Sequence, residues 1–268
     1  MQTVYVGNTL INDVMLGSQR MDDVLQSSQI LIEYLVVAGG GAGGAAPGTS
    51  IPGSGGGGGG GLRSGSLIIQ KSNTSYTVQV GGAGSGRLDN TGGNGVQSIF
   101  NNISTVGGGG GGTNGANGSS RTGVSGGSGG GGGGINGVGG AGTANQGFSG
   151  GNSNGINICG GGGGAGSAGN TAGAGASGSG SLWLDGLEYA IGGGGDGTSF
   201  PRQNQGAGYG NGAPGTYNQN IGISGQSGVV KVRYVGAPKA SGGTITQSGG
   251  YTYHTYTYSA GVTSSFVY

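Results

Sequence analysis

The apolar residues of this chain gather in short runs that predict strands. ILIEYLVV at residues 30–37 is the first clear run, and VVKVRYV at residues 229–235 has similar length and β-branched content. Further strand-like runs occupy residues 67–80, 96–106 and 182–191. No segment keeps the 3.6-residue apolar period of a helix across a window of about eleven residues. We therefore predict an all-β frame with essentially no α-helix, in which the first run pairs with the second.

Glycine-rich segments fill the chain between these strands. They cover residues 38–61, 81–95, 106–143, 147–180 and 191–215, and glycine supplies 80 of the 268 residues. Ordering one residue costs about 1–2 kcal/mol and glycine loses most, so disorder is the default. Extended glycine helices with three residues per turn offset this cost only if they lie side by side and exchange backbone hydrogen bonds. We predict packed polyglycine II helices, with the alanine, serine and asparagine of these runs on the outside.

The charge of the chain is low and balanced. Only 6% of the residues are charged, and nine basic against eight acidic residues give a net charge of +1. Charges scattered in this way form no footprint for nucleic acid or an acidic membrane surface, and no apolar run approaches the ~20 residues of a membrane span. We expect no nucleic-acid partner and no membrane insertion. The opening MQTVYVGNTL has no basic segment before an apolar one, so we expect no secretory signal.

One glycine motif resembles a nucleotide site. Gly39, Gly41 and Gly44 match G-x-G-x-x-G directly after a strand. A dinucleotide site also needs a helix that begins at this turn and an acidic residue about 20 positions later. The chain continues as AAPGTSIPGSGGGGGGG, and no Asp or Glu lies between Glu33 and Asp89. Because a glycine-rich chain produces such matches by chance, we predict no cofactor.

Residue types that carry catalysis or bind metals are sparse. Cys159 is the only cysteine, and His254 is the only histidine. The histidine stands in YTYHTYTY without a nucleophile or carboxylate beside it, so no nucleophile–base pair is indicated. Asp185 and Glu188 could share a cation, but two carboxylates three residues apart in a strand–turn segment are more often solvated. We predict no enzyme activity and no metal site.

The N-terminal residues carry a short repeat. Residues 6–15 and 16–25 align with a ten-residue period, in which glycine and a small polar residue separate apolar positions. This pattern predicts two strand–turn units. We divide the chain into residues 1–28, a strand–turn repeat that anchors the protein to other proteins, residues 29–236, a glycine-rich domain, and residues 237–268, a C-terminal β-hairpin rich in Tyr and Thr.

The C-terminal segment alternates Thr with Tyr. Tyr251 and Tyr253 share one parity, and Tyr256 and Tyr258 share the other. Both faces of the predicted strand therefore carry aromatic residues, or a bulge intervenes. Two interpretations stay open: a small aromatic core or subunit interface, and an exposed tyrosine patch that contacts a glycan or a protein receptor.

An ordered set of segments carries a resemblance to a known family. The segments IEYLVVAGGGAGG, SYTVQVGGAGSG, GGNGVQSIF, SGVVKVRYVG and GGTITQSGGYTYHTYTY resemble the glycine-rich domain of bacteriophage virion proteins, particularly tail fibres and adhesins. The resemblance covers about residues 30–268. It implies a virion component whose glycine segments form packed polyglycine helices and, in adhesins, present variable loops to a host receptor. The prolines within the glycine runs and the tyrosine-rich tail depart from the family pattern.

The function that follows is a non-enzymatic structural protein of a phage particle, with a tail fibre or adhesin role in host attachment. We expect it to be assembled in the host cytoplasm and released by lysis. We also expect it to bind other virion proteins through residues 1–28 and to contact a host surface glycan or protein. The oligomeric state stays open, and a homotrimer is one of the possible forms. The alternatives are a capsid decoration or head-fibre protein, and a non-viral glycine-rich matrix protein. The candidate receptor contacts are the aromatic residues Phe200, Tyr209, Tyr217, Tyr253, Tyr256 and Tyr258.

Overall fold

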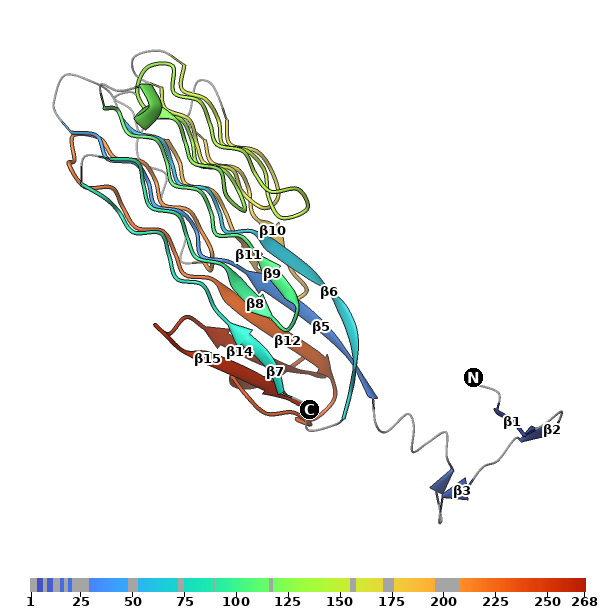
Figure 1. Cartoon of the computed structure of the whole chain (residues 1–268). Coiled ribbons are helices and arrows are strands. Elements are labelled where there is room, and N and C mark those ends of the chain that lie inside the picture. The colour runs from blue at the N-terminus through green and yellow to red at the C-terminus, as the bar shows by residue number, and fades with distance from the viewer. Residues whose placement is uncertain are drawn as a thin grey trace.

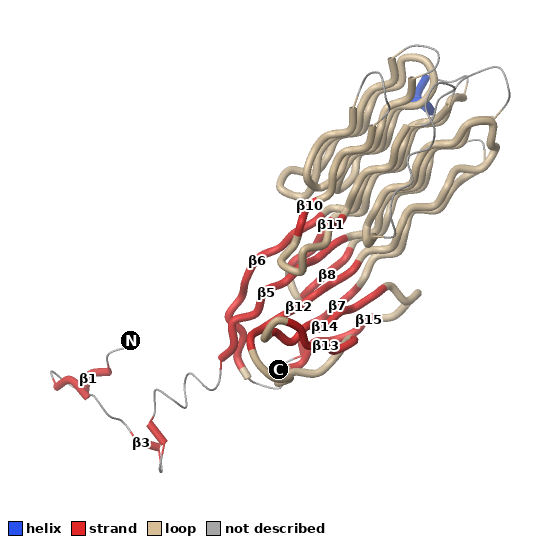
Figure 2. Tube along the Cα trace, turned by 180° about the vertical axis from the view of Figure 1, so that it is seen from behind, coloured by secondary structure: helices blue, strands red, loops and turns tan. Residues whose placement is uncertain are grey.

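The structure of this chain is a computed structural model, and it shows a β-sandwich from which long glycine segments extend (Figure 1). The residues that it describes are four short strands within residues 4–20, and residues 29–47, 53–71, 75–88, 90–115, 118–154, 158–170, 176–195 and 208–268. Figure 2 shows the same division from behind, with the strands at one end and the extended glycine segments running side by side beyond them.

A five-stranded antiparallel sheet with the order β13-β14-β12-β5-β6 forms the centre of the sandwich. Its strands are β5 (Gln29–Val37), β6 (Leu62–Gln70), β12 (Val229–Val235), β13 (Thr244–Ser248) and β14 (Tyr251–Thr257). β12 pairs with β5, so that Val229 lies opposite Val37 and Arg233 lies opposite Glu33. This register confirms the predicted pairing of the two clearest apolar runs.

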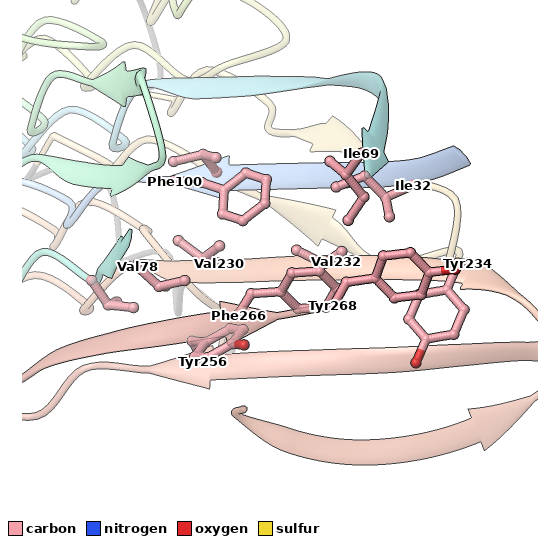
Figure 3. Close-up of a cluster of buried hydrophobic side chains, with 12 residues drawn as sticks. Ile32, Ile69, Val78, Phe100, Val230, Val232, Tyr234, Tyr256, Phe266 and Tyr268 are labelled. Atoms are coloured by element: carbon pink, nitrogen blue, oxygen red, sulfur yellow. The ribbon is translucent and has the colours of Figure 1, made fainter. Parts of the chain in front are cut away.

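A four-stranded sheet with the order β15-β7-β8-β9 packs against one face of the first sheet. Its strands are β7 (Ser75–Gln79), β8 (Ser98–Phe100), β9 (Ile103–Thr105) and β15 (Thr263–Val267). The core between the sheets consists of aliphatic and aromatic side chains at alternate strand positions (Figure 3): Ile32, Val36, Ile69, Val78, Val80, Phe100, Val230, Val232, Tyr234, Tyr256, Phe266 and Tyr268. These two sheets enclose the larger of the two apolar clusters.

A short hairpin covers part of the other face of the five-stranded sheet. Its strands are β10 (Ser181–Leu182) and β11 (Glu188–Tyr189). Trp183 and Tyr189 pack there against Leu35 and Val37. Successive residues of a strand point to opposite faces, and both faces are covered at this end of β5. Consequently Leu35, Val36 and Val37 are all fully buried, and the run reads as continuously apolar.

The glycine segments bond to one another with a period of three residues. Each N–H of residues 55–61 donates to one of three neighbouring segments in turn: Gly55, Gly58 and Gly61 to residues 106–112, Gly56 and Gly59 to residues 160–163, and Gly57 and Gly60 to residues 210–213. Carbonyl groups of the same run accept from residues 38–44, from residues 128–131 and from Gly193. The run is thus surrounded by six bonded neighbours.

Residues 38–46 repeat this pattern. Their N–H groups donate in turn to residues 55–61, 90–96 and 219–226. A three-residue period is the one that a helix with three residues per turn requires. The hydrogen bonds therefore have the lateral arrangement expected for glycine helices, and the polyglycine II geometry itself stays a prediction.

Close contact between segments explains why glycine is required. A Cβ built at any of residues 55–60 would come closer than 3.0 Å to backbone atoms of a neighbouring segment. The small residues of the runs are divided: Asn94, Ser125, Ser149 and Asn152 are exposed as predicted, whereas Ala42, Ala45 and Ser54 have no exposed surface. The prediction that they lie on the outside is therefore wrong for the second group. Ser54 shows the reason, because its hydroxyl donates to Gly44 O at 2.6 Å and accepts from Thr216 N at 2.7 Å, and so completes the bonding of the backbone.

Helical structure is nearly absent from the described residues. There the only helical element is the 3-10 turn η1 (Gly118–Arg121), and no helix among them has the length and apolar character needed to cross a membrane. Near the N-terminus, β1 (Val4–Val6) pairs with β2 (Thr9–Ile11), and β3 (Met15–Leu16) pairs with β4 (Gln19–Arg20). These two strand pairs lie within the segment of the predicted strand–turn repeat, and the predicted units themselves, residues 6–15 and 16–25, stay a prediction.

Candidate functional site

The glycine segments carry the chain away from the sandwich to an outer end, where their turns gather (Figure 1). Residues 38–46 lead there directly from β5. At the outer end, Ala45 N donates to Asn90 O at 3.1 Å and Ala46 N donates to Gln219 O at 2.9 Å. Two loops that are far apart in the sequence, around Asn90 and Gln219, are thereby placed on one scaffold.

These two loops form an exposed surface that we call the outer patch, made of Leu88, Asn90, Tyr217, Asn218, Asn220 and Ile221. Leu88 and Ile221 face each other across an isolated antiparallel bridge and are 65% and 60% exposed. The three asparagines are exposed and Tyr217 is half-buried. Apolar side chains surrounded by amides and an aromatic ring give a surface suited to contact with another molecule.

The glycine segments hold the outer patch in place. Gly222 N donates to Arg87 O at 3.1 Å, which joins the two loops. Below them, the buried Thr216 hydroxyl donates to Gly44 O at 3.1 Å. Asn218 has a φ of 50°, a left-handed conformation that asparagine tolerates better than most residues. The loops are therefore tied by backbone bonds to segments that are themselves fully bonded.

The predicted receptor contacts are not brought together. Tyr217 belongs to the outer patch, whereas Tyr209 lies at the inner end, 37% exposed and stacked on Tyr189 at 6.5 Å between ring centroids. Tyr258 is 45% exposed and lies over Gly82, also at the inner end. Phe200 falls outside the described residues. The predicted set therefore divides between the two ends of the molecule.

Tyr253 and Tyr256 lie on opposite faces of β14. The strand pairs with β12 in continuous register from Tyr251 to Thr257, so no bulge intervenes and both faces carry aromatic residues. Tyr256 faces the four-stranded sheet, where it is 3% exposed and donates to Ser265 O at 3.1 Å. Burial raises the pKa of its hydroxyl. Tyr256 was therefore wrong as a receptor contact, because the second sheet covers it.

Tyr253 belongs to a cluster around Arg233. The Arg233 guanidinium lies over the Tyr251 ring at 4.1 Å, and its Nη1 donates to Tyr253 Oη at 3.1 Å. Its Nε forms an ion pair with Glu33 at 2.7 Å. Burial alone would lower the pKa of Arg233, but the hydrogen bonds to Glu33 and Tyr253 outweigh it and raise the pKa. Since Nη1 also donates to Leu184 O at 3.0 Å, the cluster fastens the β10–β11 hairpin to the sheet.

Asp185 and Glu188 take part in separate contacts. Asp185 Oδ2 accepts from Lys231 Nζ and from Tyr189 Oη, each at 2.7 Å. Burial would raise the pKa of Asp185, but hydrogen bonds from Lys231 and Tyr189 outweigh it and hold the pKa below its usual value. Glu188 accepts from Gly180 N at 2.7 Å. Within the described part of the chain, no group of three or more His, Cys, Asp or Glu side chains could hold a metal.

His254 is fully buried in the core. Its Nδ1 lies 2.7 Å from Gly242 O, which can only accept, so this nitrogen carries the proton. Its Nε2 then accepts from Tyr234 Oη at 3.1 Å. Burial lowers the pKa of His254 although the Gly242 bond opposes the shift. The arrangement is that of a neutral, hydrogen-bonded core residue.

The backbone N–H groups of the G-x-G-x-x-G motif donate hydrogen bonds to neighbouring segments of the bundle. Gly39, Gly41 and Gly44 donate to the carbonyls of Val96, Gly58 and Gly55 at 2.8–3.0 Å. These are the groups that would have to point at a phosphate in a nucleotide site. The residues serve instead as one segment of the bonded bundle.

Of the outer patch, only Tyr217 was predicted from the sequence. Leu88 is a single apolar residue within a polar loop, and Ile221 is separated from Ile223 only by Gly222, so the sequence carries no clear signal for this pair. The bridge between Leu88 and Ile221 depends on the alignment of two glycine segments. A glycine sequence has no side-chain pattern from which this alignment could be predicted.

Comparison with known proteins gives one family. A family model described as a glycine-rich domain matches residues 24–235, which is most of the chain. No curated protein and no solved structure gives a match.

Proposed function

The chain belongs to the glycine-rich domain family, and we propose that it is a non-enzymatic structural protein of a bacteriophage particle, of the tail fibre or adhesin type, that contributes to host attachment. In this proposal residues 1–28 attach the protein to other virion proteins, and the outer patch contacts a glycan or protein of the host surface. The proposal includes assembly in the host cytoplasm, release by lysis and a homotrimeric form.

One observation supports the proposal most strongly. A bundle of glycine segments, each bonded to several neighbours, carries exposed loops to the end of the molecule remote from the sandwich. Receptor-binding residues are commonly placed on loops positioned by a rigid scaffold, because loop sequences can change without loss of the fold. The outer patch combines such a position with exposed apolar side chains, amides and a tyrosine.

The test uses the purified full-length protein. We expect the fluorescently labelled protein to bind cells of the phage's host and to block adsorption of the phage. Replacing both Leu88 and Ile221 with Asp should abolish both effects, because two charges would stand where the exposed apolar pair lies. Val262→Asp is the matched control, since Val262 is 50% exposed in a C-terminal turn remote from the patch.

Two results would contradict the proposal. One is a wild-type protein that neither binds cells nor blocks adsorption. The other is antibody labelling of phage particles that places the protein on the head, which would favour a decoration or head-fibre role.

A further inference from the structure

A second surface lies at the inner end of the glycine bundle, away from the outer patch. It is an open groove of about 920 Å³ beside the start of β6, lined by β6 residues, Tyr34 and the loop of residues 142–148. We call it the β6 groove. Its volume lies within the ~300–1,000 Å³ of ligand-binding clefts.

One polar side chain of the groove, that of Gln146, is buried and is held in place by hydrogen bonds to the backbone. Gln146 is only 7% exposed, and its Oε1 accepts from Val106 N at 2.8 Å. Its backbone carbonyl accepts from Leu62 N at 3.0 Å, which fixes the residue against β6. Because Oε1 is occupied, Nε2 is the free end of the amide, and it makes no hydrogen bond within the described residues. Gln146 lines the groove, and it therefore brings a side chain with an unpaired donor to the groove wall.

An exposed aromatic residue, Phe148, lines the same groove. Phe148 is 49% exposed, although its backbone is fixed by bonds from its N–H to Gly164 O at 3.1 Å and from Gly129 N to its carbonyl at 2.9 Å. A ring displayed on a fixed backbone loses little entropy when a ligand covers it. Phe148 thus offers a flat apolar platform at one wall of the groove.

The remaining polar groups give the groove a positive and donor-rich character. Arg63 is exposed and forms no ion pair within the described residues, and none of the groove residues is a carboxylate. Asn145 is exposed on a turn with φ of 59°. A guanidinium pairs best with a carboxylate, and amides suit hydroxyl groups.

We propose that the β6 groove binds an acidic saccharide, with the apolar face of a sugar ring on Phe148, its carboxylate at Arg63 and its hydroxyls at Gln146 Nε2 and Asn145. An extended peptide added to the β6 edge fits less well. Strand addition within the groove needs the outward backbone groups of the β6 residues that line it, and Leu62 N is already bonded to Gln146 O. The inference is independent of the proposed host contact at the outer patch.

Calorimetric titration of the full chain tests this site. The probes are a disaccharide of glucuronic acid and N-acetylglucosamine, the neutral N,N′-diacetylchitobiose, and a synthetic Thr-Val-Thr-Val-Thr peptide. We expect the acidic disaccharide to bind more tightly than the neutral one. Phe148→Ala should weaken both sugars by at least about tenfold, and Arg63→Gln should remove the preference for the acid. Arg87→Gln, an exposed arginine at the outer end, should bind as wild type.

Three results would overturn the site. The first is no binding of the acidic disaccharide at about 10 mM. The second is unchanged binding by both groove variants. The third is binding of the peptide in preference to either sugar. Because Arg63 and Phe148 are exposed, both variants should fold, and unchanged fluorescence of Trp183, the single tryptophan, verifies this.

Discussion

Gly58 is the position at which one added methyl group tests the glycine bundle most sharply. It lies in the run that has six bonded neighbours. A Cβ there would collide with the backbone of residues 128–129, including Gly129 O at 2.7 Å. The colliding atoms are backbone and cannot rotate away as a side chain could. Gly58→Ala therefore requires two segments to move apart.

The cost follows from what that movement breaks. Inserting a methyl group into a packed interior costs about 1–3 kcal/mol. The carbonyls of Ser128 and Gly129 accept from Gly109 N at 2.9 Å and Gly163 N at 2.8 Å, and a buried group left unpaired costs about 1–3 kcal/mol. Replacing glycine with alanine restricts the unfolded chain, which offsets about 0.4–1 kcal/mol of this loss in stability. The middle of these ranges gives a net loss of about 3 kcal/mol, or roughly 6–12 °C in Tm.

Differential scanning calorimetry measures this effect. The matched control is Gly115→Ala, because the nearest atom to a Cβ there is Thr113 Cγ2 at 3.4 Å, an ordinary contact. The control should unfold within about 2 °C of the wild type. If Gly58→Ala and Gly115→Ala unfold at the same temperature as the wild type, the close packing of the glycine segments is refuted.

Three further experiments test other parts of the structure. Ser128 has a buried hydroxyl without a partner in the described residues, so Ser128→Ala should leave stability unchanged or raise it. Ser54→Ala removes two buried hydrogen bonds and should lower the free energy of unfolding by about 1–3 kcal/mol, as measured by calorimetry. Equal effects of the two substitutions would contradict the assigned hydrogen bonds. Because burial lowers the pKa of His254, the unfolded chain binds the proton more readily, so the contribution of His254 to stability should be fully present above about pH 6.5 and decrease as the pH falls below it. His254→Gln should therefore reduce the change in Tm between about pH 7 and 5. An unchanged slope of Tm against pH would refute the assignment. Arg233→Lys removes the hydrogen bonds to Leu184 O and Tyr253 and should lower the free energy of unfolding in urea by about 2 kcal/mol. Arg87→Lys should leave this free energy unchanged. Equal unfolding midpoints for the two variants would show that the Arg233 cluster does not contribute to stability.

The strands could be predicted from the sequence because their side chains carry a pattern. The runs at residues 30–37 and 229–235 are apolar and β-branched, and they pair as expected. The alternation around His254 left two possibilities, aromatic residues on both faces of β14 or a bulge, and the continuous register with β12 shows the first. What the alternation could not show is which face the second sheet covers, and Tyr256 was misplaced for that reason.

The glycine segments were harder to predict, because residues without side chains carry no pattern that sets their alignment. The sequence indicated lateral backbone bonding in general, but not that residues 55–61 bond to residues 106–112, 160–163 and 210–213. Small residues were expected outside, yet Ser54 lies inside because its hydroxyl replaces a missing backbone partner. The outer patch depends on the same alignment, so only its Tyr217 was identified.

Hydrogen exchange of the glycine amides tests the central claim, that the glycine segments form an ordered, mutually bonded bundle. NMR on uniformly ¹⁵N-labelled protein reports these amides and those of the strands directly. The structure predicts that residues 55–61 exchange as slowly as the strand amides of β5, only through global unfolding, while the exposed turn glycines Gly249 and Gly261 exchange rapidly. Exchange of residues 55–61 as fast as that of the turn glycines would contradict it.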